Sequence, residues 1–171
     1  REAYSATLKN YLRNYEDLTY IDLNKEYYFD DTKYHTIGID FNFTLTSCFS
    51  MFQGCDHTLY LNLSFLTEEV ENMRCMFLQC KSLTSLDVSH FKTSKVKDMS
   101  SMFHFCEKVP KIDVSAFETS QVTAMSAMFS NCLKVTSLNL ANFDTSEVID
   151  MNSMFKGASS LKDIKLGNFI F

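Results

Sequence analysis

A unit of about 26 residues that repeats along the chain constrains the fold more than any other feature. The pair Met-Phe returns at intervals of 25, 26, 26 and 26 residues. A cysteine stands three residues after each Phe except in the last copy, where Ala158 takes its place. The pairs begin at Met51, Met76, Met102, Met128 and Met154. Such a repeat predicts supersecondary units that stack and bury a continuous core between them.

Each unit also carries the apolar pattern L-x-x-L-x-L-x-x-F, which is Leu83, Leu86, Val88 and Phe91 in one copy. The alternation of Leu86 and Val88 has the two-residue period of a strand with one buried face. We therefore predict a leucine-rich-repeat solenoid with parallel strands in one curved sheet. Six strands are expected, starting near Leu18, Thr58, Leu83, Val109, Val135 and Leu161.

The segment that returns to the next strand reads V-x-x-M-x-x-M-F and predicts the opposite wall of the solenoid, formed by a short strand and a tight or 3₁₀-like turn. Val96, Met99, Met102 and Phe103 are expected to point inward. The chain has only 4 Gly and 1 Pro, so other residues must form its turns. We expect Thr-Ser hydroxyls to bond local backbone there. These pairs begin at Thr93, Thr119 and Thr145.

Residues 1–171 are expected to form a single repeat domain. Residues 1–17 have helical spacing of apolar residues and predict an N-terminal capping helix. Residues 18–57 read as an irregular first repeat with an insertion, and residues 58–171 as regular repeats. No repeat follows the strand that starts near Leu161, so we expect an open strand edge. A longer parent protein, a folded-back tail or end-to-end self-association would each cover it.

The whole unit L-x-x-L-D-x-S-x-F-x-T-S-x-V-x-x-M-x-x-M-F-x-x-C resembles the BspA-like leucine-rich repeat, also known as the mycoplasma-lipoprotein type. The resemblance is close from about Cys55 to Phe169 and loose before it. It implies a leucine-rich-repeat fold and a surface protein of bacteria, with relatives in protists and some large viruses. Members of the family are associated with adhesion and host binding. The family implies no general catalytic residues.

Composition and motifs argue against several functions. The net charge of −5 and the lack of a basic run disfavour nucleic acid and anionic membranes as partners. No apolar run is long enough to span a membrane. Four dispersed glycines offer no phosphate-binding loop, and the four histidines occupy four different repeat positions. We therefore expect no enzymatic activity, no metal and no cofactor.

Four cysteines lie one repeat apart and are expected to stack as a ladder. Neighbouring rungs about 5 Å apart fall within the Cα range of a disulfide, but side chains in one column point the same way. Their spacing is unlike the paired ligands of a structural zinc site. We interpret them as buried, reduced thiols, with disulfides and a metal as alternatives. The ladder is Cys55, Cys80, Cys106 and Cys132.

The outward positions of the strands form the candidate binding face. One column predicts an acidic and amide stripe, and the column beside it carries tyrosines at the N-terminal end. The stripe reads either as a solvated hydrogen-bonded ladder or as a recognition face, with a weak cation between Asp87 and Asp113 as a remote alternative. The candidate residues are Tyr20, Asp22, Tyr60, Asn62, Asp87, Lys111, Asp113, Asn139, Asp163 and Lys165.

These features favour a non-enzymatic binding or adhesion module of a microbial cell-surface or secreted protein, which recognises a protein or glycan. The alternative is an intracellular, cytoplasmic interaction scaffold, since reduced thiols fit a reducing compartment. Two sequons, at Asn42 and Asn62, carry no weight without knowledge of the host.

Overall fold

The computed structural model describes residues 44–55, 60–62 and 67–170. The expected capping helix over residues 1–17, the strand near Leu18 and the insertion before residue 44 lie outside the described residues. So does the expected strand start at Thr58. The repeats that can be compared with the prediction therefore begin at Thr44.

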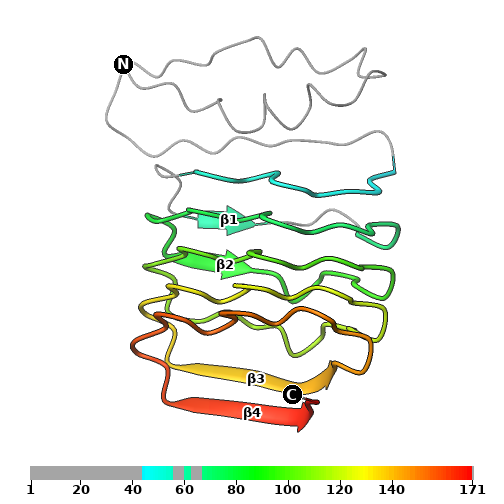
Figure 1. Cartoon of the computed structure of the whole chain (residues 1–171). Helices are drawn as coiled ribbons and strands as arrows, with labels where there is room; N and C mark the ends of the chain where they lie inside the picture. Colours follow the sequence, from blue (N-terminus) through cyan, green and yellow to red (C-terminus); the bar gives the residue numbers. More distant parts are fainter. Residues whose placement is uncertain (1–43, 56–59, 63–66, 171) are drawn as a thin grey trace, which may run out of the picture.

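Four short strands fall within the described residues, and each pairs in parallel with a strand one repeat away (Figure 1). β1 (Tyr60–Asn62) pairs with β2 (Ser85–Asp87), with Tyr60 opposite Ser85. β3 (Ser137–Asp144) pairs with β4 (Asp163–Asn168), with Ser137 opposite Asp163. The partners are the positions that the repeat aligns, so the front wall of the stack is built in the predicted register.

Between these pairs, the segment that was expected to form a strand from Val109 forms no regular strand. Pro110, the chain's single proline, stands at the start of this segment. Proline has no N–H to donate to a neighbouring strand, and it is disfavoured inside a sheet. Two two-stranded sheets therefore stand where the sequence predicts one continuous sheet, and the six-stranded arrangement stays a prediction.

The return segments form the second wall and are joined from turn to turn by backbone hydrogen bonds. Parallel bridges link Ser47, Asn72, Asp98, Ala124 and Asp150 in succession. Between two interior turns, Met99 N donates to Ala124 O at 2.9 Å and Phe103 N donates to Met128 O at 3.0 Å. Parallel pairing of one segment per repeat is what the stacking of equal units requires.

Each return segment also bends twice through tight turns. Met102 N donates to Met99 O at 3.2 Å, and Cys106 N donates to Phe103 O at 3.0 Å. The third residue of each turn, Ser101 (φ 56°) or Phe105 (φ 61°), has the positive φ of a type II turn. The same two positions have positive φ in the other copies, at Ser50 and Gly54, Cys75 and Gln79, Ala127 and Asn131, and Ser153 and Gly157.

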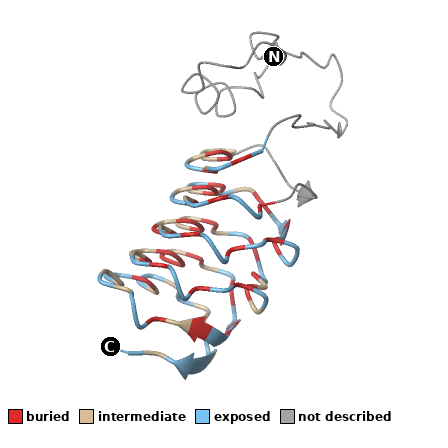
Figure 2. Ribbon diagram, turned by 90° about the vertical axis from the view of Figure 1, so that its right-hand side faces the viewer, coloured by how far each residue is buried: buried red, intermediate tan, exposed pale blue. Residues whose placement is uncertain are grey.

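The core runs as a column through the stack (Figure 2). Val96, Met99, Met102 and Phe103 are all buried, which confirms the inward direction predicted for the return segment. Phenylalanine rings stack on one another, with centroids 5.7 Å apart between Phe77 and Phe103. Stacked aromatic pairs stabilise by about 0.5–1.5 kcal/mol beyond their buried area, so this column ties consecutive turns together.

Buried threonines form a further link between turns. The Thr93 hydroxyl donates to Glu118 O at 2.9 Å and accepts from Glu118 N at 2.8 Å, and Thr67 bonds Lys92 in the same way. We expected these hydroxyls to bond local backbone. Instead they reach the next repeat, because the threonine side chain is buried against it, while the carbonyl of Thr93 closes the local turn with Val96 N at 3.0 Å.

Candidate functional site

The structure brings the described members of the candidate binding face onto the front wall. Asp87, Asn139, Asp163 and Lys165 are exposed, and Asp113 is half-buried. Asn139 lies opposite Lys165 in the β3–β4 pair. Of the remaining candidates, Lys111 is exposed, and Tyr60 and Asn62 lie in β1. Tyr20 and Asp22 lie outside the described residues.

The acidic and amide stripe makes local hydrogen bonds. Asp87 accepts from Ser89 N at 2.9 Å and from the Ser89 hydroxyl at 2.6 Å. Asp113 accepts from the Ser115 hydroxyl at 2.7 Å, and Asn139 accepts from Ala141 N at 3.3 Å. Each of these bonds joins the side chain to the residue two positions on, the local backbone bonding that Asp and Asn side chains favour. One oxygen of each residue therefore serves the backbone.

The same hydrogen bonds set the ionisation of the stripe. Bonds from Ser89 lower the pKa of Asp87, and bonds from Ser115 and Lys111 lower that of Asp113. Lys111 Nζ lies 3.1 Å from Asp113 Oδ2. Both carboxylates are therefore charged at neutral pH. Among the described residues, no group of three or more His, Cys, Asp or Glu side chains could hold a metal ion.

The cysteines of the predicted ladder occupy equivalent positions in consecutive turns. Cys80, Cys106 and Cys132 are buried as predicted, whereas Cys55 is only half-buried. The thiols of Cys80, Cys106 and Cys132 donate to the carbonyl oxygens of Phe52, Phe77 and Phe103, at 3.0, 3.3 and 3.2 Å. Burial raises the pKa of Cys106, and it raises that of Cys132 to about 12. A hydrogen bond with Cys55 and burial raise the pKa of Cys80. Such thiols are protonated and poor nucleophiles. In this structure they pack in the core and hydrogen-bond to the backbone of the neighbouring turn.

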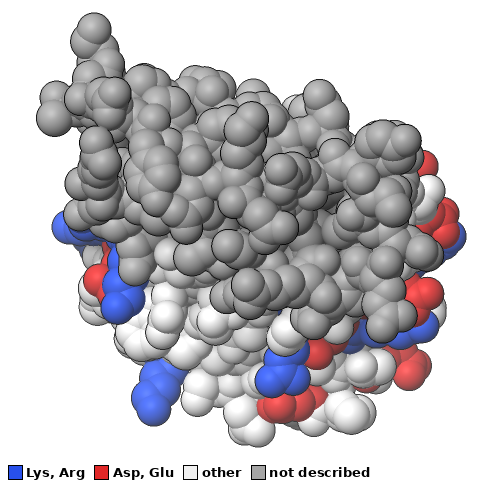
Figure 3. Space-filling model, turned by 90° about the horizontal axis from the view of Figure 1, so that it is seen from above, with Lys and Arg blue, Asp and Glu red and all other residues white. Residues whose placement is uncertain are grey.

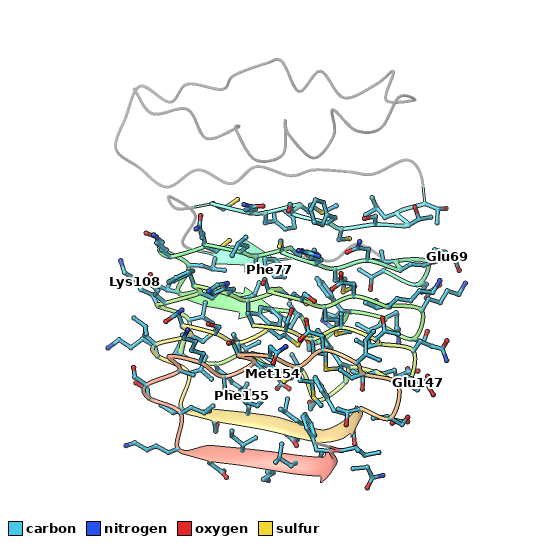
Figure 4. All side chains as sticks on the ribbon, viewed as in Figure 1. Glu69, Phe77, Lys108, Glu147, Met154 and Phe155 are labelled. Carbon is cyan, nitrogen blue, oxygen red and sulfur yellow. The ribbon has the colours of Figure 1, made fainter. Side chains whose placement is uncertain are left out.

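The distribution of charge between the two edges of the stack could not be seen by reading the sequence linearly. Figure 3 looks down the stack and shows most of the visible acidic side chains at the right-hand edge. Figure 4 places Glu69 and Glu147 at that edge and Lys108 at the opposite one. The signal is present only when the repeats are aligned, because Lys108 and Lys134 then fall in one column.

The described residues define a protein of stacked repeats, joined by parallel backbone bonds and a shared core. The chain belongs to the family described as "Mycoplasma protein of unknown function, DUF285", whose model matches residues 46–169. Neither the curated proteins nor the solved structures contain a significant match to the chain. In the part of the chain that the structure describes, no helix is long and apolar enough to cross a membrane.

Proposed function

We propose that this chain is a leucine-rich-repeat solenoid of the BspA-like type that acts as a non-enzymatic binding or adhesion module on a microbial surface, with a protein or a glycan as ligand. One observation carries the proposal. Between turns, the buried positions repeat almost unchanged, whereas exposed front positions change chemistry. The column of Asp87 continues as Asp113, Asn139 and Lys165. A rigid frame with a varied outer surface suits recognition.

A binding measurement tests this proposal directly. The purified chain is applied to arrays of extracellular-matrix proteins and glycans, together with a Lys111→Ala/Asp113→Asn variant of the front wall. A Lys92→Ala/Glu118→Gln variant is the matched control, since it also removes one positive and one negative charge, both at exposed positions. Binding that the front variant loses and the control keeps supports the proposal. Equal binding by all three proteins contradicts a role for the front wall.

Location on the cell surface is tested separately. Antibody labelling of intact source cells should detect the protein without permeabilisation. The second candidate, an intracellular interaction scaffold, is favoured by the buried thiols of Cys80, Cys106 and Cys132, which suit a reducing compartment. Labelling that requires permeabilisation would favour this alternative.

A further inference from the structure

Four exposed lysines, one in each of four consecutive turns, form a lysine row along one edge of the stack. The row is Lys81, Lys108, Lys134 and Lys162. Lys108 and Lys134 occupy the same repeat position, Lys81 stands one position earlier and Lys162 two positions later. Consecutive parallel segments lie about 4.8 Å apart, so the row presents close to one positive charge per such step.

The lysine row differs from the opposite edge in how its charges are paired. On the opposite edge, Lys95 Nζ lies 2.6 Å from Glu69 Oε2, and Lys97 Nζ lies 2.7 Å from Glu71 Oε2. No lysine of the row forms an ion pair with a carboxylate of the described residues. Like charges on adjacent segments repel each other, so placing Lys108 beside Lys134 does not stabilise the fold.

An aromatic pair lies beside the row and is unusual in its backbone. Phe105 has φ 61°, at the turn position that Gly54 and Gly157 occupy in other repeats. A bulky residue in this left-handed conformation is strained, and the half-exposed ring of Phe105 recovers little of that cost by burial. The His104 ring stacks on it at 4.3 Å, and Lys81 Nζ lies 5.8 Å from its centroid.

We infer that this edge binds a linear acidic polysaccharide that runs along the stack, with the lysine row facing its carboxylates or sulfates and the Phe105–His104 pair facing the apolar side of one sugar. The turn spacing of about 4.8 Å is similar to the length of one sugar in an extended chain. The inference rests on the proposed binding function, but it places this ligand on the edge and not on the front wall.

A nucleic acid is the competing polyanion, and the observations favour it less. Duplex DNA carries a charge about every 1.7 Å along its axis, and each strand carries one about every 3.4 Å, so both are denser in charge than the row. The chain as a whole carries a net charge of −5, which repels a dense polyanion. Glu107, half-exposed next to Lys108, and the exposed Asp163 next to Lys162 lower the net positive charge of this edge, which disfavours a densely charged polymer more than a sparsely charged one.

The test measures binding of the whole chain to polygalacturonate oligosaccharides, dextran sulfate, neutral dextran and an oligo-dT strand. We expect binding to at least one acidic polysaccharide that weakens as salt rises, with no binding to neutral dextran. Lys108→Glu/Lys134→Glu should lower the affinity by about tenfold or more. Lys92→Glu/Lys95→Glu makes the same change in net charge at exposed positions outside the lysine row, and it should retain the affinity.

Phe105→Gly separates binding from folding. Because glycine occupies this turn position in two other repeats, the denaturation midpoint should stay equal or rise, while polysaccharide affinity falls. Equal losses in both double lysine variants, tighter binding of oligo-dT, or no binding to any acidic polysaccharide would overturn the inference. If the chain does not bind these polymers but still binds an array ligand through its front wall, the inference fails and the proposed function stands.

Discussion

The interior turns and the last turn carry equivalent residues in the same register, yet they bury them differently. Phe103 and Phe129 are each 0% exposed, whereas Phe155 is only half-buried. Leu140 is 0% exposed, and its partner Leu166 in β4 is 44% exposed. An interior turn has a neighbour on both sides, and the last turn has one. A turn therefore buries its apolar residues mainly against other turns.

The exposed side chains of the last turn form the apolar surface on which end-to-end association was predicted. Ile170 is 60% exposed, and Leu161, Ile164 and Phe169 are half-buried. Such a surface is unfavourable in water and suits a further turn or another chain. Self-association at this surface stays a prediction.

The largest expected difference between the two regions concerns the phenylalanine column. Phe103→Ala should lower the free energy of unfolding by about 3–5 kcal/mol, because it empties a fully buried site between two stacked rings. Phe155→Ala should cost clearly less, because its ring is half-buried and stacks on Phe129 from one side. Urea denaturation of both variants measures the difference.

Phe117→Ala and Glu118→Ala give the internal control for this measurement. Phe117 is 1% exposed and Glu118 is exposed, so the first change should cost about 3–5 kcal/mol and the second less than about 0.5 kcal/mol. Similar denaturation midpoints for Phe103→Ala and Phe155→Ala would contradict the idea that stacking produces the burial.

A smaller difference is expected for the buried threonines. Thr93→Val leaves both Glu118 N and Glu118 O without their hydroxyl partner, which should cost about 1–3 kcal/mol. At the end of the stack, Thr145 accepts a single described bond, from Ile170 N of the last turn at 2.9 Å. Thr145→Val should therefore cost less. Thermal unfolding compares the two, and a larger effect at Thr145 would refute the assignment of these bonds to the stack.

The cysteine position gives the next smaller effect, because the last turn already carries alanine there. Cys106→Ala removes the thiol bond to Phe77 O, which still accepts from Cys80 N at 3.2 Å. We expect a loss of about 1 kcal/mol. Ala158→Cys should stay within about 0.5 kcal/mol of the parent chain. Chemical denaturation measures the free energy of unfolding of both variants. A strongly stabilising Ala158→Cys would show that the last turn is packed like the interior.

The smallest effect concerns acid. The folded-state pKa of Asp113 is lowered, so its contribution to stability is present above the unfolded pKa of about 3.9 and is lost as pH falls through the folded value. Asp113→Asn should keep the turn bond from Ser115 N, as Asn139 keeps its own from Ala141 N. Melting curves between neutral pH and about pH 2 should fall less steeply for this variant than for the parent chain. An unchanged pH dependence would show that the Asp113 carboxylate does not stabilise the fold.

The sequence was sufficient to predict the repeat phase and therefore the core. The apolar pattern marked Leu83, Leu86, Val88 and Phe91 as inward, and all four are buried. These positions can be predicted from the spacing of apolar residues alone, because each of these buried positions of the repeat is occupied by an apolar residue. The Asp and Asn column was also placed on the outside.

Other features could not be predicted because they depend on the residues of the next turn. Ser101 and Phe105 are not residues that signal a positive φ, so the sequence predicted one tight or 3₁₀-like turn in each return segment and not the two turns with positive φ that the structure shows. The Thr93 hydroxyl was assigned to its own turn, although its partner is 25 residues away. The lysine row likewise arises from the stacking of repeats, and no short window of sequence contains it.

The direction of the hydrogen bonds between turns has a mechanical consequence. Bonds such as Phe103 N to Met128 O join one turn to the next, so they point along the axis of the stack. A force that pulls the two ends apart along this axis is parallel to these hydrogen bonds. It breaks the interfaces between turns one after another and does not shear them all at once. The stack should lengthen in steps of one whole turn and yield at low force, which makes it a compliant extensible tether.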